Sequence, residues 1–220
     1  MSIIFNNIDK MSFDDLGEES EFIPLMTSED EEALEKESLP EVLPILPLTN
    51  TVLFPGVVIP INAGRDKSIK LINDANKSNK LIGVVAQKNS KIENPTIENI
   101  YGIGTVAKIL RVLKMPDGNT TVIIQGKKRF KIKSVVKTDP YIQATVDPVS
   151  DKSQKKSDSN FLATIDAIKD IALKIIKENP NIPSEASFAI KNIHSSTFLI
   201  NFVCSNMNIT VKDKQELLSS

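Results

Sequence analysis

Two short motifs in the sequence have the spacing of known nucleotide-binding or catalytic sites. From Gly102 to Ala107 the letters GIGTVA match a dinucleotide fingerprint, whose glycines let a helix N-terminus approach a pyrophosphate. The residues that follow, KILRV, are typical of a strand, so the helix that such a site needs is missing. Ser153 and Lys156 have the S-x-x-K spacing of some acyl-transfer enzymes, but they lie in a polar stretch that would leave the lysine exposed. Neither motif predicts a catalytic site.

Histidine and cysteine, which often carry catalysis or bind metal ions, are nearly absent. His194 is the only histidine and Cys204 the only cysteine, so neither a histidine relay nor a zinc site can be assembled from these residues. We interpret His194 as a capping or surface residue and Cys204 as a thiol of the core. The sequence contains no G-x-x-x-x-G-K-[ST] loop. We therefore expect no catalytic residue, metal site or cofactor site in this sequence.

Two features favour binding instead. The first is apolar surface at two predicted corners, which would suit varied apolar segments of a polypeptide because Met is flexible and Phe offers area. These corner residues are Leu53, Phe54, Pro55, Leu113, Met115 and Pro116. The second is a basic strand face that would contact phosphates, formed by Lys127, Lys128, Arg129, Lys131 and Lys133. The alternatives are that the corners pack against their own domain and that the basic face is only solvated.

The stretch Leu43–Arg65 organises the elements that would position these residues. Its four prolines exclude a helix and restrict any strand to a sheet edge or a bend, since proline lacks the N–H of a ladder bond. Short strands are predicted at Ile45–Leu48 and Val57–Ile61. Between them, Pro55-Gly56 suits the centre of a type II turn, where glycine takes the positive φ.

The chain up to about residue 149 is predicted to form a closed β domain. Apolar residues at helical spacing predict a surface helix at Arg65–Asn76, and a continuous apolar run predicts a buried strand at Leu81–Ala86. A hairpin turn is expected around Met115-Pro-Asp-Gly. Further strands are predicted at Ile103–Leu113, Thr120–Gln125, Arg129–Lys133 and Tyr141–Val146. Strands at this spacing predict a compact, barrel-like domain over residues 42–149.

A polar linker at residues 150–159 precedes a helical part at 160–220, so the predicted fold class is α+β. The first helix should end before Pro180 and bury one face, made of Phe161, Ile165, Ile168, Ala172 and Ile175. Two more helices are predicted at Ser184–Asn192 and Ser195–Ser205, and a last one capped by Thr210 with Asp213. Because that last helix starts close to Ser220, we expect a fragment of a longer protein.

Charge divides the chain in two. Residues 1–41 hold 13 acidic residues against Lys10 and Lys36, a net charge of −11, whereas residues 42–220 carry +10. Such an acidic segment buries too little surface to fold, so we predict a disordered arm that is either a solvated tail or a shield for a basic surface. No apolar run is long enough for a membrane span, and the N-terminus lacks a signal peptide, so a cytoplasmic protein without a membrane partner is expected.

Many of these motifs, taken in order, closely resemble the N-terminal domain of the Lon protease family. The matching segments are Leu46-Pro-Leu48, Val52-Leu-Phe-Pro-Gly-Val-Val-Ile-Pro60, Gly64-Arg65, Val85-Ala-Gln-Lys88, Gly104-Thr-Val-Ala-Lys-Ile109, Met115-Pro-Asp-Gly118, Gly126-Lys-Lys-Arg-Phe-Lys-Ile132 and Pro140-Tyr-Ile-Gln-Ala144. A looser similarity continues through Phe198–Cys204 and Gln215–Leu218. The acidic arm departs from the family's commoner pattern.

The resemblance implies a PUA-like pseudo-β-barrel followed by an α-helical bundle. In that family this region recognises unfolded or degron-bearing polypeptides and supports a homohexameric ring. The resemblance further implies that the parent is an ATP-dependent serine endopeptidase of protein quality control, which degrades misfolded and regulatory proteins. Its ATP and Mg sites and its Ser-Lys dyad would lie in modules beyond this sequence.

Two alternatives remain open. One is a PUA-like nucleic-acid-binding module, which the charge of +10 favours but an inward-pointing Phe130 disfavours, since no aromatic platform would lie beside the lysines. The other is a stand-alone Lon-like domain without a protease.

Overall fold

The computed structural model of the chain describes residues 39–114, 120–149, 159–179 and 185–220. Six strands are present: β1 Val42–Leu48, β2 Val58–Ala63, β3 Leu81–Ala86, β4 Ile103–Lys114, β5 Thr120–Lys137 and β6 Gln143–Pro148. The helices are α3 Asp66–Lys77, the 3₁₀ turn η2 Ile97–Asn99, α4 Ser159–Glu178, α5 Glu185–Asn192, α6 Ser196–Asn206 and α7 Val211–Ser219. The elements predicted from the sequence are therefore confirmed, except that residues 120–137 form one strand.

The strands close into a ring. Their order is β2-β5-β4-β3-β1-β6, and a further pairing joins β5 to β6. β5 closes the ring because its first part pairs with β2 and its last part pairs with β6, while β4 runs along its other side. Closure leaves fewer exposed strand edges than an open sheet would.

β1 is an exception to the expectation that its prolines confine it to a sheet edge. It pairs in parallel with β3 and antiparallel with β6, so it lies inside the ring. The register gives the reason: residues 42–44 are paired only with β6 and residues 45–48 only with β3. Pro44 and Pro47 each have a strand partner on one side only, which leaves a side where the missing N–H costs no ladder bond.

The predicted corner between β1 and β2 is confirmed as a type II turn. Gly56 has a φ of 78°, and the Val57 N–H donates a hydrogen bond of 3.3 Å to the Phe54 carbonyl. Phe130 points into the barrel, as expected, and is fully buried. A Cβ at Gly83 or at Gly104 would lie 2.9 or 3.0 Å from the Phe130 ring, so both glycines make room for it.

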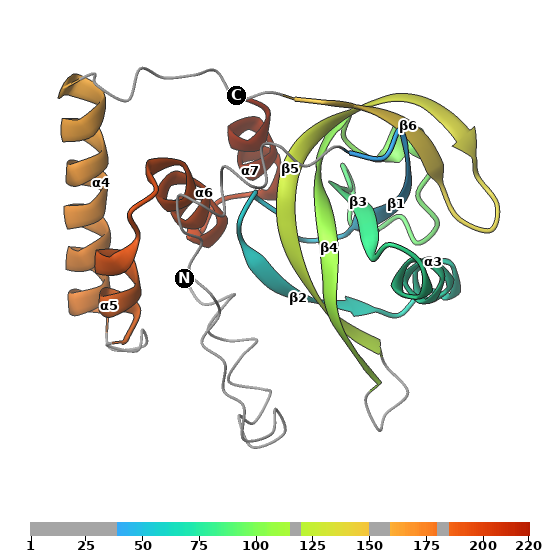
Figure 1. Ribbon diagram of the computed structural model, residues 1–220, viewed down its shortest axis with the longest axis horizontal. Coiled ribbons are helices and arrows are strands. Elements are labelled where there is room, and N and C mark those ends of the chain that lie inside the picture. Colours follow the sequence, from blue (N-terminus) through green and yellow to red (C-terminus); the bar gives the residue numbers. More distant parts are fainter. Residues whose placement is uncertain (1–38, 115–119, 150–158, 180–184) are drawn as a thin grey trace.

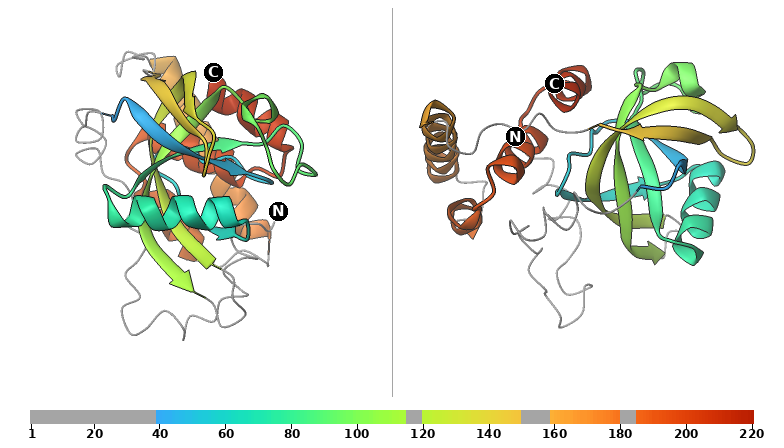
Figure 2. Two further views of the ribbon diagram at one scale, coloured as in Figure 1. Left: turned by 90° about the vertical axis from the view of Figure 1, so that its right-hand side faces the viewer. Right: turned by 45° about the horizontal axis from the view of Figure 1, so that its top comes forward.

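The C-terminal helices α4 to α7 extend outward from one side of the barrel, whereas α3 packs on β1 and β3. α7 packs on β4, α6 on α7, and α4 on both α5 and α6. Figure 1 shows this order, with α4 and α5 farthest from the barrel, and the right-hand view of Figure 2 agrees. The α+β class, with a barrel followed by helices, is confirmed. None of the described helices has the length and apolarity that a membrane span requires.

α7 is the helix that joins the two parts. Its predicted cap is confirmed: the Asp213 N–H donates to Thr210 Oγ1 at 3.1 Å, and Asp213 Oδ2 accepts from the Thr210 N–H at 3.3 Å. Gln215 Nε2 donates a 3.0 Å hydrogen bond to the Ile103 carbonyl at the start of β4. The position of the helical part on the barrel therefore depends on specific polar contacts as well as on apolar packing.

Candidate functional site

The predicted apolar corner at Leu53-Phe54-Pro55 is largely internal. Leu53 is 2% exposed and Phe54 is 1% exposed. Thr105 Oγ1 donates a 2.6 Å hydrogen bond to the Leu53 carbonyl, and a Cβ at Gly126 would clash with the Phe54 carbonyl oxygen. The prediction that this corner exposes Leu53 and Phe54 is wrong, because β4 and β5 lie against it. Pro55 alone is half-exposed.

The second predicted corner is only partly described. Leu113 is half-buried near the end of β4, where it is paired with Thr121 of β5. Met115 and Pro116 fall in the gap between residues 114 and 120. A binding role for this corner stays a prediction.

The basic residues of β5 have different surroundings. Arg129 Nη1 donates hydrogen bonds to the Leu218 carbonyl (2.7 Å) and to Ser220 O (3.3 Å), at the end of α7 where backbone oxygens lack helical partners. Lys133 Nζ lies 3.6 Å from Asp147 Oδ1, Lys131 is exposed, and Lys127 and Lys128 are half-buried. Arg129 thus fastens α7 to the barrel, and the five residues do not form a uniform face. Phosphate binding by the other four stays a prediction.

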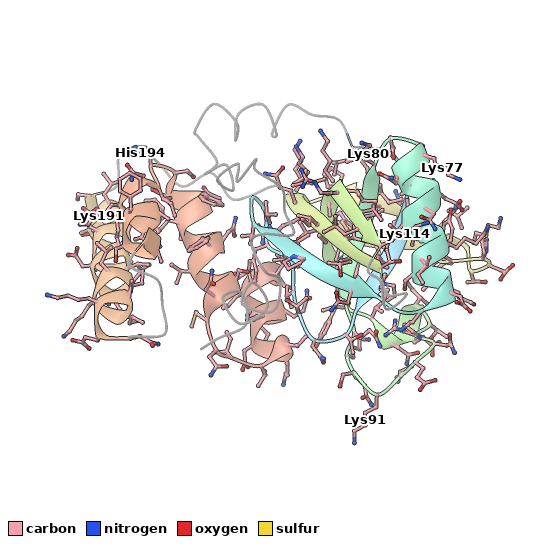
Figure 3. The ribbon with its side chains drawn as sticks, turned by 90° about the horizontal axis from the view of Figure 1, so that it is seen from below. Lys77, Lys80, Lys91, Lys114, Lys191 and His194 are labelled. Atoms are coloured by element: carbon pink, nitrogen blue, oxygen red, sulfur yellow. The ribbon has the colours of Figure 1, made fainter. Side chains whose placement is uncertain are left out.

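The structure also places the residues considered for catalysis. Gly102 to Ala107 lead into and form the start of β4 with no helix after them, which excludes a dinucleotide site of the fingerprint type. Ser153 and Lys156 lie outside the described ranges. His194 is exposed between α5 and α6 (Figure 3), as expected for a surface residue. Over the described part of the chain, no three His, Cys, Asp or Glu side chains gather in a way that would hold a metal ion.

Cys204 lies at the edge of the core and is half-buried on α6. Burial raises the pKa of its thiol, and the positive charge of Lys214 partly opposes that rise. Burial also lowers the pKa of Lys214, whose Nζ donates a 2.5 Å hydrogen bond to the Ser205 carbonyl. The thiol is therefore a weak nucleophile at neutral pH, which fits a packing role.

α4 buries most of the predicted face, but not Ile175 at its C-terminal end. Ile165 is its one fully buried residue among those described, while half-buried residues packed against the core are Phe161, Ala172, Leu173 and Ile176. Ile175 was expected in the core, yet it is 39% exposed. The buried face is rotated toward Leu173 and Ile176, because α4 packs on two helices, α5 and α6, at once.

This rotation leaves large apolar side chains in solvent on the two outermost helices. Ile171 and Ile175 lie one turn apart on α4, and Ile171 is 60% exposed. Phe188 of α5 is 69% exposed, more than any other large apolar residue that the structure describes. We name Ile171, Ile175 and Phe188 the outer apolar surface.

A hydrogen bond from α4 sets the register of the two outer helices. Lys169 Nζ donates to the carbonyls of Lys191 and Ile193, both at 3.1 Å. Since α4 ends at Glu178 and α5 begins at Glu185, the two helices run side by side in opposite directions. Phe188 therefore lies at about the height of the Ile171–Ile175 turn. The sequence offered one signal of this surface: α4 has more apolar residues than a single buried stripe can hold.

Comparison with known proteins gives consistent matches. Residues 42–220 match the family described as the ATP-dependent protease La (LON) substrate-binding domain. The Lon protease of Flavobacterium johnsoniae is 63% identical over 212 residues, which cover 96% of this chain and 26% of that protein. The Lon protease of Cytophaga hutchinsonii is 51% identical, over 90% of this chain and 24% of that protein. The chain thus spans about a quarter of the length of these relatives.

Two solved structures share the fold. The N-terminal domain of the Mycobacterium avium complex Lon protease superposes with a TM-score of 0.65 at 20% identity, over 81% of this chain and 90% of that one. The Lon N-terminal domain protein from Xanthomonas campestris gives a TM-score of 0.59 at 15% identity, with the same coverage of 81% and 90%. At these identities the likeness supports the architecture of barrel and helices.

Proposed function

The chain belongs to the family of LON substrate-binding domains, and from that premise we propose that its outer apolar surface captures apolar segments of unfolded or degron-bearing polypeptides. The observation that carries the proposal is the exposure of Phe188 on α5 at about the height of the exposed Ile171 and Ile175 on α4. Large apolar side chains gathered in water are typical of surfaces that bind a polypeptide. Their place on the helices farthest from the barrel keeps them accessible to an extended chain (Figure 1).

The size of the surface predicts weak and degenerate binding. Full burial of one such side chain is worth about 1.5–3 kcal/mol, and association itself has a large entropic cost. Three side chains therefore support a low affinity for many apolar sequences. Several copies in one ring would raise the apparent affinity for a long unfolded chain by avidity.

For the parent protein we propose a homohexameric, ATP-dependent serine endopeptidase of the cytoplasm, which degrades misfolded and regulatory proteins. The relatives' name and their greater length support this proposal. ATP, Mg and the Ser-Lys dyad would belong to modules outside these 220 residues. The nucleic-acid alternative lacks a stacking platform on β5, since Phe130 is fully buried.

The proposal is tested by titrating fluorescently labelled, unfolded casein with the 220-residue chain and recording anisotropy. We expect Phe188→Ser and Ile171→Ser to weaken binding about tenfold when combined, which corresponds to about 1.4 kcal/mol. The matched control is Val136→Ser, because Val136 on β5 is also 56% exposed and apolar but lies outside the outer apolar surface. Unchanged affinity in the double variant, or an equal loss in Val136→Ser, would reject this surface as the binding site.

A further inference from the structure

The two strands of the hairpin β4–β5 carry charge of a single sign. They contain nine Lys or Arg residues and no Asp or Glu. Toward the end of β5 these cations have defined neighbours, since Arg129 binds the end of α7 and Lys133 lies near Asp147. Toward the tip of the hairpin, Lys108, Arg111 and Lys114 of β4 are all exposed. The tip half therefore presents positive charge directly to solvent.

The end of α3 adds two more cations to this region. The Lys80 N–H donates to the Ala75 carbonyl (2.9 Å) and the Lys80 carbonyl accepts from the Ile109 N–H (2.8 Å), so Lys80 lies between α3 and β4. Figure 3 shows Lys77, Lys80 and Lys114 on the side of the barrel that carries α3, far from Lys191 and His194. We name this set the basic end: Lys77, Lys80, Lys108, Arg111 and Lys114.

Carboxylates do little to compensate the basic end. β3, β4 and β5 contain none, α3 contains two, and Asp117 belongs to the loop between β4 and β5, outside the described residues. Asp66 begins α3, away from Lys77 at its other end, and Asp74 accepts a 3.2 Å hydrogen bond from the Tyr141 hydroxyl. Asp66 follows β2, whose last residue Ala63 pairs with Thr120 opposite Lys114, but among the described residues no ion pair joins Asp66 or any other carboxylate to the basic end. The five cations of the basic end outnumber the carboxylates near them, so this end of the barrel has an excess of positive charge that attracts anions.

We propose that the basic end is a docking surface for an acidic polypeptide segment, and that its resident occupant is the chain's own N-terminal arm, residues 1–38. The sequence of this arm holds 12 acidic residues against Lys10 and Lys36, a net charge of −10. The arm and the basic end thus have opposite charges within one chain. This inference is independent of the outer apolar surface.

The arm starts close enough to reach the basic end. The Glu41 carbonyl accepts a hydrogen bond from the Val146 N–H of β6, and Val146 is paired with Ile132 of β5, so the arm begins beside β6, one strand away from β5. From Ile132 back to the first residue of β5, Thr120, the strand spans about 40 Å at ~3.3 Å per residue. A chain of 38 residues, the length of the arm, has an end-to-end distance of about 35 Å if it behaves as a random coil, and its maximal reach is much longer.

Because the arm belongs to the same chain as the basic end, weak contacts are sufficient to hold it there. A segment attached to the same chain acts at an effective concentration on the order of millimolar, so exposed charge pairs that would fail between separate molecules hold it in place. The arm then competes with any other acidic segment for the basic end. An acidic partner must displace it, and removal of the arm makes the surface available.

The first test is zero-length carbodiimide cross-linking of the full chain at low salt, with mass-spectrometric mapping of carboxylate–lysine links. We expect arm carboxylates to be joined to Lys77, Lys80, Lys108 and Lys114 at least fivefold more often than to exposed lysines of the helical part, and the difference to vanish at ~0.5 M salt. The control lysines are Lys174, Lys177, Lys191 and Lys212, all exposed. An even distribution of links, or a preference for the control lysines, would overturn the proposal.

The second test is a titration with a labelled peptide of residues 9–38. A variant that lacks residues 1–38 keeps all of β1, which begins at Val42, and we expect it to bind the peptide about tenfold more tightly than the full chain does. Adding Lys108→Gln, Arg111→Gln and Lys114→Gln should abolish this gain, while Lys174→Gln, Lys177→Gln and Lys212→Gln should leave it intact. Equal affinity of the full and shortened chains, or a gain that survives the first triple substitution, would refute arm docking.

Discussion

Two phenylalanines illustrate how the barrel and the outer helices differ in the burial of their apolar side chains. Phe54 lies at a corner of the barrel and is almost completely buried, whereas Phe188 on α5 is largely in solvent. The barrel is a closed ring in which glycines at 83, 104 and 126 allow close contacts. The helix pair α4–α5 instead leaves several of its apolar side chains uncovered. Apolar residues therefore serve stability in the barrel and remain available for contact on the outer helices.

The largest difference in stability is expected between alanine variants of these two phenylalanines. Phe54→Ala would leave a cavity between the corner and β4–β5, so we expect it to lower the free energy of unfolding by about 3–5 kcal/mol. Phe188→Ala removes an exposed ring and should change the same quantity by less than about 0.5 kcal/mol. Urea unfolding followed by circular dichroism measures both. A comparable loss in the two variants would contradict the division of roles.

The sequence predicted most of the barrel. For the Leu53-Phe54-Pro55 corner it left open two outcomes, exposure for binding and packing against its own domain. The type II turn follows from Pro55-Gly56 alone, and the alternation around Phe130 predicted its inward direction. Phe54 looked exposed because a proline-glycine corner is usually a surface loop. Its cover comes from Thr105 and Gly126, far along the chain, and local patterns carry no information about such contacts.

In the helical part, a local cap could be predicted from the sequence, whereas the packing of α4 could be predicted only in part. The Thr210–Asp213 cap was predictable because capping depends on residues three positions apart. The buried face of α4 was predicted as far as Ala172 but not at Ile175, because apolar residues cover more than one stripe of the helix. The choice between Ile175 and Ile176 as the buried residue depends on where α5 and α6 pack, which the sequence of α4 does not specify.

A smaller effect is expected for the glycine against the corner. Gly126→Ala would press a Cβ against the Phe54 carbonyl oxygen, a contact with backbone that cannot move aside easily. We expect a loss of about 1–3 kcal/mol of unfolding free energy, as for overpacking. Gly64→Ala is the control, since nothing lies within 4 Å of a Cβ there. Equal stability of the two variants would show that the corner adjusts to fit.

The next largest loss of stability is expected for Arg129, whose hydrogen bonds join the barrel to α7. Arg129→Gln removes the charged donor to the end of α7, and we expect a loss of about 1–2 kcal/mol, confined to the helical part. Hydrogen exchange should accelerate in α7 and α6 but not in β3 or β4. Lys133→Gln, which breaks an exposed pair with Asp147, should cost less than about 0.5 kcal/mol. Faster exchange throughout the barrel would mean that Arg129 stabilises both regions.

The smallest expected effect is on the alkylation rate of Cys204, which reports on the helical part. Its pKa is raised by burial above the ordinary 9.0, so at any pH below that value it has a smaller thiolate fraction than a free cysteine. Alkylation by iodoacetamide at pH 8 should therefore be slower than for a cysteine peptide and should rise with pH. Lys214→Met removes the charge that opposes this rise and should slow alkylation further. A rate equal to that of the free peptide would indicate that α6 opens readily.

The most direct test of the central claim is a hydrogen-exchange footprint of the chain with and without saturating unfolded casein. The outer apolar surface predicts added protection in α4 and α5, around Ile171–Ile175 and Phe188, and no change at the Leu53–Gly56 corner. Protection at the corner or along the barrel, with α4 and α5 unchanged, would contradict the account.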